Sequence, residues 1–462
     1  MRALTGALGG AERTRVIVLL ASVLALSSAD AATVGAAATP LREALGISNT
    51  DIGLLVTVTS LVAAVASLPF GLLADRVRRT RTLGVAIVVW GVAMIWSATA
   101  GSFGKLLLTR LLLGGVTAAA GPLVASLVGD YFASAERGRI YGYILAGELA
   151  GAGVGFAVTG DVAALSWRAA FVLLALPAFV LAWLIFHLPE PVRGGRAPLV
   201  VPNAAVSTAA DDDTDAQRLA RERGLVPDPE LVEDADPNRL GLFRATRYIL
   251  RIRTNVALIL ASAGGYFFLA GVQTFGVEFV TRQYGIDQAL GTLVLLVVGI
   301  GGVAGVLAGG ALGDLLLHRG VLNGRILVAA IAGTLAVGLF VPAIFTHHAT
   351  MALPYITAAA LALSAQNPPL DAARLDIMVP LLWGRAEGVR TFLRTLGQAL
   401  APVTFGGVSD YVFGGGRSGL QWTFALMLLP LCASAYFLYK ALATYPRDVA
   451  TAAAATHRQR PT

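Results

Sequence analysis

The sequence predicts an all-α integral membrane protein with twelve transmembrane helices in two related halves of six. Three observations support this fold class. The 462 residues are 56% hydrophobic and only 14% charged, whereas about a quarter of the residues of a soluble domain are charged. The apolar residues form long runs, each able to cross a hydrocarbon core about 30 Å thick. A Gly-xxx-Asp motif ends the second segment of each half, at Gly71–Asp75 and Gly310–Asp314.

The twelve apolar segments follow one another through short connections, apart from one long polar stretch in the middle. Their approximate bounds are 14–38, 50–74, 82–101, 104–128, 139–161, 167–188, 254–280, 288–313, 324–346, 350–379, 387–412 and 418–442. The first segment is too long for the apolar part of a cleavable signal peptide, so we expect it to remain as a spanning helix.

Basic residues gather in alternate loops, and this asymmetry orients the chain. The loops after segments 2, 4 and 8 carry two to four Arg each, and the first of them contains Arg76, Arg78, Arg79 and Arg81. The intervening loops carry at most one Arg or Lys. Because Lys and Arg favour cytoplasmic loops, we predict a multi-pass protein of the cell inner (plasma) membrane with both termini in the cytoplasm.

The segments and the polar stretch predict four regions: an N-terminal bundle 1–192, a cytoplasmic linker 193–253, a C-terminal bundle 254–445 and a cytoplasmic tail 446–462. The middle of the linker, Asp211–Asp236, is acidic and contains Pro, which is typical of a solvated disordered segment. Its last part, Asn238–Arg253, interleaves Arg with apolar residues and predicts a basic amphipathic helix at the inner headgroups.

The composition excludes several classes of protein and site. Cys432 is the single cysteine, which excludes disulfides and cysteine-rich metal sites, and the five His lack metal-ligand spacing. The net charge of +7 comes from Arg at the ends of apolar segments, which indicates a membrane surface rather than nucleic acid. The phosphate-binding pattern GxxxxGK[S/T] does not occur. We therefore expect no cofactor, a proton as the coupling ion, and a monomer whose partners are membrane lipids and a small-molecule substrate.

The stretch GLLADRVRRTRTL resembles the signature loop of the major facilitator superfamily, Gly-xxx-Asp-Arg/Lys-x-Gly-Arg-Arg/Lys. Gly71, Asp75, Arg76 and Arg79 match that pattern, while Arg78 stands where the family has its second Gly. The resemblance implies the major facilitator fold, in which two pseudo-symmetric six-helix bundles rock about a central site.

In such a fold this loop acts as a conformational latch. Gly71 lets a neighbouring helix come close, and Asp75 can pair with an Arg or a helix N-terminus across the bundle interface. The repeat in the second half adds Gly310 and Asp314 to the predicted latch, beside Arg76 and Arg79 in the first.

Longer stretches resemble the spinster branch of the superfamily, whose members move lysophospholipids and sphingoid lipids. These are FGKLLLTRLLLGGVTAAAGPLVASLVGDYFASAERGR in segment 4 and GVRTFLRTLGQALAPVTFGGVSD in segment 11, and the resemblance covers about residues 20–440 without the linker. Two positions depart from the branch: Ala31 replaces the Arg that follows the segment-1 Asp, here Asp30, and Thr117 replaces a Glu of segment 4. The departures leave lipid specificity and the details of coupling open.

Three ionisable residues fall inside apolar segments of the first half: Asp30, Arg110 and Glu148. A charge at the membrane centre costs roughly 2.5–3.5 kcal/mol, so each requires a reason. We hypothesise that Arg110 compensates Asp30, Glu148 or each in turn, so that a carboxylate binds and releases a proton as its surroundings change. Asp30 is the better candidate because it matches the family position, and a permanent ion pair is the alternative.

The second half carries a charged cluster near the inner ends of segments 10 and 11. Asp371 and Arg374 lie three residues apart and share a helix face, as do Glu387 and Arg390. With Asp376 they predict an inner-gate network that joins the two segments.

Five residues are candidates for the substrate cavity: Thr117, Tyr266, Gln273, Asn367 and Arg394. Tyr266 and Gln273 are seven apart on one face, and Asn367 precedes two Pro that free backbone carbonyls. Arg394 is the better candidate of the segment-11 Arg residues for contact with an anionic headgroup.

We therefore expect a secondary active transporter that moves an amphipathic, lipid-like or drug-like small molecule by alternating access, coupled to protons. The alternatives are a multidrug or metabolite efflux antiporter of the same superfamily, a membrane-embedded enzyme, and a sensor that no longer transports. No catalytic residues are predicted, so an enzyme is not expected.

Overall fold

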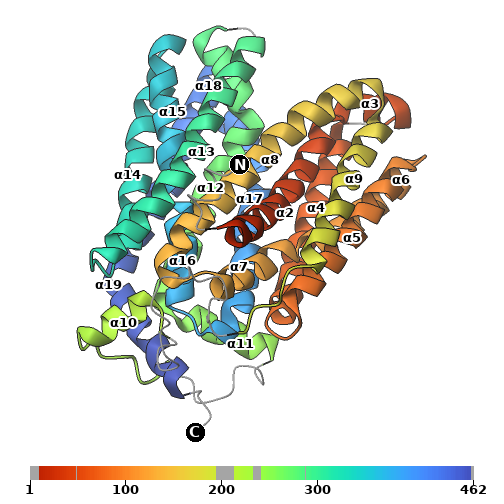
Figure 1. Cartoon of the computed structure of the whole chain (residues 1–462). Helices are drawn as coiled ribbons and strands as arrows, with labels where there is room; N and C mark the ends of the chain where they lie inside the picture. The colour runs from red at the N-terminus through yellow and green to blue at the C-terminus, as the bar shows by residue number, and fades with distance from the viewer. Residues whose placement is uncertain (1–9, 48, 194–212, 233–240, 287, 459–462) are drawn as a thin grey trace.

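The computed structural model describes residues 10–47, 49–193, 213–232, 241–286 and 288–458. Within these ranges every regular element is a helix. The helices form two groups that converge toward the end where the linker helices and the C-terminus lie, and splay apart toward the other end (Figure 1). We call these two ends the closed end and the splayed end.

The first group, the N-half, contains the six segments predicted before the linker. Its long helices are α2 (Ala11–Ala36), α4 (Asn49–Ala74), α5 (Arg79–Ala98), α6 (Phe103–Thr117) followed by α7 (Ala120–Tyr131), α8 (Arg137–Leu165) and α9 (Trp167–Phe186). The short helix α3 (Ala38–Leu45) joins α2 to α4 at the splayed end, and the short turn η1 (Ser134–Glu136) joins α7 to α8.

The second group, the C-half, contains the other six. Its long helices are α12 (Arg253–Tyr284), α13 (Gln288–His318), α14 (Gly324–Phe345), α15 (Ala349–Ala365) followed by α16 (Asn367–Asp376), α17 (Trp383–Gly407), and α18 (Gly416–Leu426) followed by α19 (Leu428–Arg458). Two short turns, η3 (Pro380–Leu382) and η4 (Val408–Val412), flank α17. The two halves confirm the predicted fold class.

Two spans are interrupted by a turn at equivalent positions. The break between α6 and α7 precedes Pro122, and the break between α15 and α16 precedes Pro368. An offset of 246 residues carries Pro122 onto Pro368, so the breaks belong to the internal repeat. Because Pro has no N–H for the carbonyl four residues back, the helical ladder is interrupted at both places.

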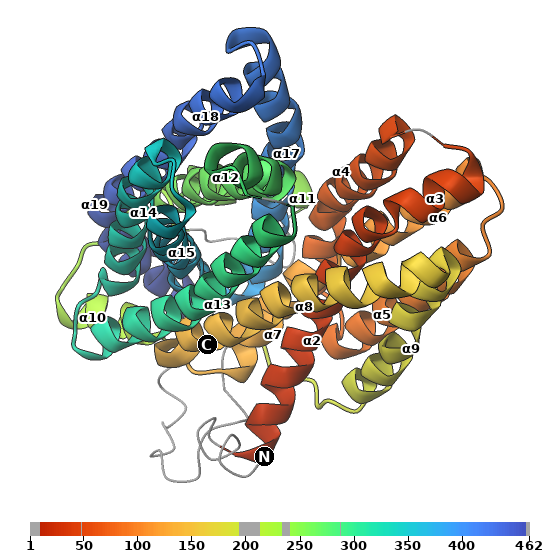
Figure 2. The same cartoon turned by 90° about the horizontal axis from the view of Figure 1, so that it is seen from above.

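By length and hydropathy alone, ten helical stretches of the described residues qualify as membrane spans. The helices α8 and α17, which are the predicted segments 5 and 11, fall outside that set although they are 29 and 25 residues long. Both lie between the halves, where α8 packs against α13 and α17 packs against α4 (Figure 2). In α17, contact with protein on this face replaces contact with lipid, so the charged residues in the first half of this helix are tolerated.

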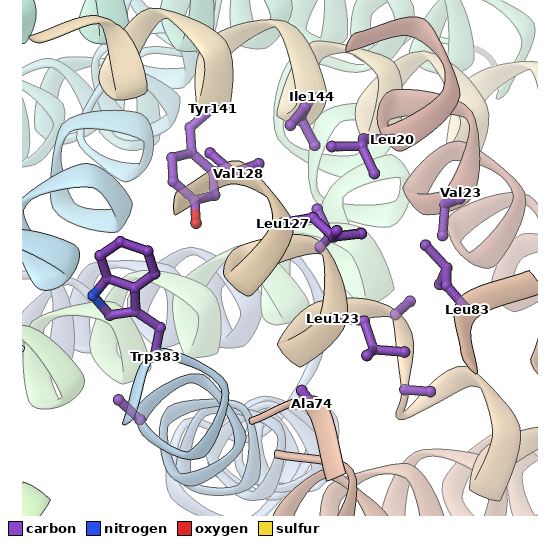
Figure 3. Close-up of a cluster of buried hydrophobic side chains, with 14 of the residues drawn as sticks. Leu20, Val23, Ala74, Leu83, Leu123, Leu127, Val128, Tyr141, Ile144 and Trp383 are labelled. Atoms are coloured by element: carbon purple, nitrogen blue, oxygen red, sulfur yellow. The ribbon is translucent and has the colours of Figure 1, made fainter. Parts of the chain in front are cut away.

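A core of buried apolar side chains unites the halves at the closed end. Figure 3 shows part of it, with Leu20 of α2, Leu127 of α7 and Ile144 of α8 on the side of the N-half. Trp383, the first residue of α17, reaches this core from the C-half and is 2% exposed. Burial of a large apolar side chain contributes about 1.5–3 kcal/mol, so this core favours closure of the two halves at this end.

Part of the acidic linker is folded, which corrects the expectation of a solvated disordered segment for residues 213–232. Helix α10 (Asp215–Glu222) begins with a capping box, in which Thr214 and Gln217 exchange side-chain and backbone hydrogen bonds. Ala216 and Ala220 are buried, and α10 packs against α19. The remaining acidic positions, 211–212 and 233–236, lie outside the described residues.

The predicted basic helix near the end of the linker is α11 (Leu242–Arg251). Ala245, Tyr248 and Ile249 of this helix are buried, while its Arg residues are exposed. The last helix, α19, runs on to Arg458 without interruption at the boundary predicted after residue 445.

Candidate functional site

Asp75, directly after α4, joins the two halves at the closed end. Its carboxylate accepts hydrogen bonds from the backbone N–H of Gly384 (2.8 Å) and of Arg385 (3.0 Å), and from the Arg385 Nε (2.8 Å). These N–H groups lie in the first turn of α17, where a helix has unpaired donors and partial positive charge. Burial raises the pKa of Asp75 to about 6 while Arg385 and the backbone donors oppose a further rise, so Asp75 is ionised at neutral pH.

Asp314, near the end of α13, makes the matching contact in the opposite direction. It accepts hydrogen bonds from the backbone N–H of Gly138 (3.1 Å) and Arg139 (2.7 Å), in the first turn of α8. The Arg325 guanidinium adds an ion pair at 2.7 Å. Each half therefore binds a helix N-terminus of the other half through one carboxylate.

The close approach of the halves at these contacts requires Gly71 and Gly310. A methyl group on Gly71 would lie 2.7 Å from the carbonyl oxygen of Gly384, closer than packed atoms come. A methyl group on Gly310 would overlap the carbonyl oxygen of Gly138. A larger residue at either position would push the halves apart.

Arg79, at the start of α5, acts within the N-half. Its guanidinium pairs with Asp130 and with Glu190 (2.9 Å), and Glu190 also accepts from the backbone N–H and the hydroxyl of Thr80. Burial acts to raise the pKa of Glu190, but the hydrogen bonds from Thr80 and the Arg79 charge outweigh it and hold this pKa below its ordinary value. Arg76 is exposed.

The offset of 246 residues carries Arg79 onto Arg325 and Asp130 onto Asp376. Arg325 accordingly pairs with Asp376 at 2.6 Å, and the Tyr445 hydroxyl donates to the same carboxylate at 2.8 Å. This corrects the predicted inner-gate network, because Asp376 binds at the start of α14 rather than beside the other four members.

The other four members of that network do meet. Asp371 and Glu387 each accept from both Arg374 and Arg390, with N–O distances between 2.6 and 3.0 Å. All four side chains are buried and belong to the C-half. The N-half has Ala125, Val128, Tyr141 and Ile144 at the equivalent positions, and three of these apolar or aromatic side chains are labelled in Figure 3.

Asp30 of α2 and Arg110 of α6 form a buried ion pair inside the N-half. The Arg110 Nη1 lies 2.9 Å from the Asp30 Oδ1, and the Trp90 Nε1 donates to the Asp30 Oδ2 at 3.3 Å. The Arg110 guanidinium also lies 4.8 Å over the ring of Phe171. Arg110 therefore compensates Asp30 in this conformation.

Glu148 of α8 lies elsewhere, among charges of the C-half. It is half-buried, and the positive group that acts on it most strongly is Arg394 of α17 rather than Arg110. The Arg394 guanidinium stacks 4.4 Å over the ring of Tyr266 on α12. Its Nε is buried without a hydrogen-bond partner among the described residues.

The remaining cavity candidates take different positions. Thr117 ends α6 at the break in segment 4, and its hydroxyl donates to the carbonyl of Leu113 at 2.9 Å. Asn367 begins α16 and is half-buried. Gln273 of α12 is exposed and lies about two helical turns beyond Tyr266 toward the splayed end.

Sequence reasoning missed the partners of the two latch carboxylates. Each carboxylate binds the first two residues of a Gly-Arg-x-x-Gly motif. The motifs are GRIYG from Gly138 and GRAEG from Gly384, and the same offset of 246 residues relates them. The repeat itself was the signal that could have found them.

The arrangement combines two features. At the closed end, a matched pair of carboxylate contacts holds two related halves together and can be released without unfolding either half. Glu148 and Arg394 come from different halves, and Arg394 is the positive group that acts most strongly on Glu148. A movement of the halves would change the surroundings of both groups.

Comparison with known proteins agrees with this geometry. Residues 20–402 match the family model described as Major Facilitator Superfamily. A probable L-galactonate transporter of Escherichia coli (strain K12) is 29% identical over 175 residues, which are 37% of this chain and 38% of that protein. A spinster homolog 1 of Xenopus laevis is 27% identical over 184 residues (39% and 35%). The quinolone resistance protein NorA of Staphylococcus aureus is 29% identical over 154 residues (32% and 38%). The matches thus span less than half the length of these relatives.

Solved structures match over nearly the whole chain. FucP in its outward conformation superposes with a TM-score of 0.66 at 12% identity, covering 92% of this chain and 98% of that one. A bacterial homolog of the human lysosomal transporter spinster, in an inward-facing conformation, gives a TM-score of 0.57 at 19% identity, covering 95% and 98%. The fold of two six-helix halves and the resemblance to the spinster branch are confirmed.

Proposed function

Because this chain belongs to the Major Facilitator Superfamily of membrane transporters, we propose that it moves an amphipathic small molecule with an anionic group by alternating access. The observation that carries this proposal is the Arg394 guanidinium, stacked on Tyr266 with a buried Nε that lacks a partner among the described residues. A guanidinium fixed on an aromatic ring is oriented for bidentate binding of a carboxylate or phosphate. The relative named for L-galactonate, an organic anion, supports this choice.

We place the closed end on the cytoplasmic side of the inner membrane, because the Arg-rich loops lie at the closed end. In this orientation the structure is outward-facing. The Asp75 and Asp314 contacts then close the inner gate, and the inward-facing state requires both to break.

Coupling to protons is the second part of the proposal. Asp30 is fully engaged by Arg110 and Trp90, whereas Glu148 is half-buried and the cation that acts on it most strongly, Arg394, belongs to the other half. A carboxylate whose cationic neighbour belongs to the opposite half loses that neighbour when the halves move, and its proton affinity then rises. Glu148 is therefore the better candidate for the proton carrier, and Asp30 the better candidate for a permanent pair.

Efflux of cationic drugs is the second candidate function. It is favoured by the same Glu148, since a half-buried carboxylate at the cavity also attracts cations, and by the relative named for quinolone resistance. A catalytic role for the linker acids has less support. Asp213 pairs with Arg221 and His457, and Asp215 binds Ser134, so both hold the linker on the protein surface.

Transport by the purified protein in liposomes tests the proposal. The probes are radiolabelled decyl phosphate, whose dianion crosses a bilayer slowly, a lysophospholipid, and the cation ethidium. We expect a pH gradient to drive accumulation of decyl phosphate by the wild type, and Arg394→Gln to reduce it at least tenfold. Glu148→Gln should retain binding but abolish the response to the pH gradient.

A matched control is Lys440→Gln, because Lys440 also stands over a Tyr ring, at 5.5 Å from Tyr436, but on the outer surface of α19. This variant should transport like the wild type. Accumulation of ethidium alone would favour the efflux alternative. Equal transport of decyl phosphate by wild type and Arg394→Gln would reject the anion site.

A further inference from the structure

The N-half contains a pocket that the proposed function does not use. It lies between α2, α5 and the break between α6 and α7, and its volume with the open mouth is about 330 Å³. Apolar side chains form most of its wall, including Ile87, Trp90 and Ala120, and Ser27 and Thr117 are the polar residues in it. The centres of water-sized groups can occupy only about 30 Å³ of this space, so the pocket fits a short alkyl chain or a single ring and nothing larger.

The internal repeat shows that the corresponding space in the C-half is filled. The offset of 246 residues carries Ala120 onto Gln366, which is 1% exposed at the break between α15 and α16. A methyl group on Gly333 of α14 would lie 3.1 Å from the Gln366 Oε1, and one on Gly265 of α12 would lie 2.6 Å from its Nε2. The side chain of Gln366 therefore occupies the space between these two helices.

The same positions in the N-half line the pocket. Gly333 corresponds to Ile87 through the offset of 246. Ala25 of α2 lies next to Gly151 of α8, and Ala263 of α12 lies next to the equivalent Gly397 of α17. Aligning α2 with α12 through these two Ala residues carries Ser27 onto Gly265. Where one half inserts Gln366, the other has the methyl group of Ala120 and a pocket.

The apolar wall decides what can occupy the pocket. Water needs two to four polar partners to remain in a cavity, and apolar cavities in proteins stay dry and bind apolar molecules. The Thr117 hydroxyl already donates to a backbone carbonyl of its own helix. An alkyl chain or an aromatic ring fits this surface, and a polar head does not.

The pocket also lies close to the proposed anion site. Gly121, next to Ala120, faces the C-half, because a methyl group there would lie 3.6 Å from the Thr391 Oγ1. Arg394 is one helical turn from Thr391 toward the splayed end, and Thr117 is one turn from Gly121 in the same direction, since the two helices run antiparallel. Thr117, at the pocket, and Arg394 thus lie at a similar depth on facing halves.

We propose that this pocket binds the apolar chain or ring of the transported amphiphile while Arg394 binds its anionic group. This assignment rests on the proposed function and makes it more specific. The substrate class becomes a short-chain or single-ring anionic amphiphile, too small to be a two-chain lipid.

The test uses n-alkyl phosphates of six to twelve carbons as probes, titrated calorimetrically into the full-length protein in nanodiscs, with empty nanodiscs subtracted. In the wild type we expect the affinity to rise about fourfold with each methylene group until the pocket is full, and then to level off. Ala120→Gln copies the solution of the C-half, so the rise should stop at a shorter chain and decyl phosphate should bind at least tenfold more weakly.

Val85→Gln is the matched control, because Val85 precedes Ala86 of the pocket wall and is 54% exposed on the outer face of α5. It should bind every probe like the wild type. Ala120→Gln should still bind hexyl phosphate, and the double variant Ala120→Gln with Arg394→Gln should not. This result would show that the Ala120→Gln protein is folded.

The outcomes separate the two proposals. The same dependence on chain length in Ala120→Gln and wild type would overturn the pocket assignment, even if decyl phosphate is transported. Binding that depends on Ala120 without transport of any probe would support the pocket and overturn the proposed function.

Discussion

The guanidinium of Arg137, the first residue of α8, lies 4.8 Å over the ring of Trp383, the first residue of α17. The offset of 246 residues makes the two positions equivalent, so they meet on the pseudo-twofold axis at the centre of the closed end. The Trp383 Nε1 donates to the carbonyls of Leu375 and Met378 and thereby fixes the ring to the C-half. A contact on the axis is broken by any movement that separates the halves there.

We therefore predict that Trp383→Leu favours the inward-facing state. A desolvated cation–π contact contributes about 2 kcal/mol, which corresponds to a roughly thirtyfold change in the population ratio. Spin labels at the exposed positions Arg78 and Arg319, with Cys432 replaced by Ser, report the distance between the halves by double electron–electron resonance. Trp422→Leu, which removes an exposed Trp near the splayed end, should leave the distances unchanged. Equal effects of the two variants would show that the axis contact does not control the gate.

The latch carboxylates lead to a second prediction. Asp75→Asn keeps one acceptor oxygen but removes the charge that faces Arg385 and the α17 N-terminus. Hydrogen bonds to charged groups contribute about 1.5–3 kcal/mol, so the inner gate should open more often and transport should slow. Arg385→Gln should cause a similar change, and the double variant should be little worse than either alone because the two side chains share one contact. Additive losses would mean that Asp75 and Arg385 act separately.

The sequence predicted the helices better than their partners. The apolar runs located the long helices of both halves because a helix in lipid must satisfy its own backbone, although length and hydropathy alone select only ten spans among the described residues. The Gly-xxx-Asp motif indicated the latch carboxylates, and Asp30 and Arg110 were correctly paired as one of the alternatives. The helices and the Gly-xxx-Asp motif follow from local pattern, and the pairing of Asp30 with Arg110 follows from the cost of an unpaired charge inside an apolar segment.

What the sequence could not give depends on contacts between distant segments. Asp376 shares its helix with Asp371, yet it binds Arg325 because it lies at the far end of α16 beside α14. The acidic composition of the linker indicated disorder, but Ala216 and Ala220 of α10 are buried and α10 packs on α19. The composition of the linker carries no information about this distant helix. The difference between the pocket beside Ala120 and the filled space in the other half is recognised only when Ala120 is compared with the equivalent Gln366.

The contact of Glu190 with the start of α5 predicts a dependence of stability on pH. Its pKa is held below the ordinary value of 4.5, so its contribution is fully present above that pH and is lost as the pH falls through the lowered pKa. Glu190→Gln should therefore lower the melting temperature at pH 7, by the equivalent of about 1–2 kcal/mol, and the difference from wild type should shrink below pH 4. Thermal unfolding in detergent from pH 7 to 3.5 measures this. A difference that stays constant over the whole range would show that the charge of Glu190 plays no part.

The folded linker predicts a further contribution to the inner gate. The Ser134 hydroxyl of the N-half exchanges hydrogen bonds with the backbone and carboxylate of Asp215 on α10, while Gln217 binds the Asp376 carbonyl in the C-half. Ser134→Ala removes the contact with the N-half alone, at a cost of about 0.5–1.5 kcal/mol per hydrogen bond, so the same spin labels should report a larger inward-facing population.

Thr451→Ala is the control for this effect, because Thr451 accepts a hydrogen bond from the linker residue Asp228 entirely within the C-half. It should loosen the linker without moving the gate. Unchanged distances in Ser134→Ala would show that α10 is bound to the C-half alone and does not help to hold the halves together.

The pair of Asp30 and Arg110 separates structure from coupling. Asp30→Asn leaves the Arg110 guanidinium buried with a neutral neighbour, and loss of one partner of a buried ion pair costs about 3–5 kcal/mol. We expect a lower melting temperature and weak transport from this variant. Asp30→Asn combined with Arg110→Leu removes both charges and should recover most of the stability. If Asp30 is only a structural partner, the double variant also recovers transport driven by the pH gradient, as measured in liposomes. Recovery of stability without recovery of proton-driven transport would instead identify Asp30, and not Glu148, as the group that carries the proton.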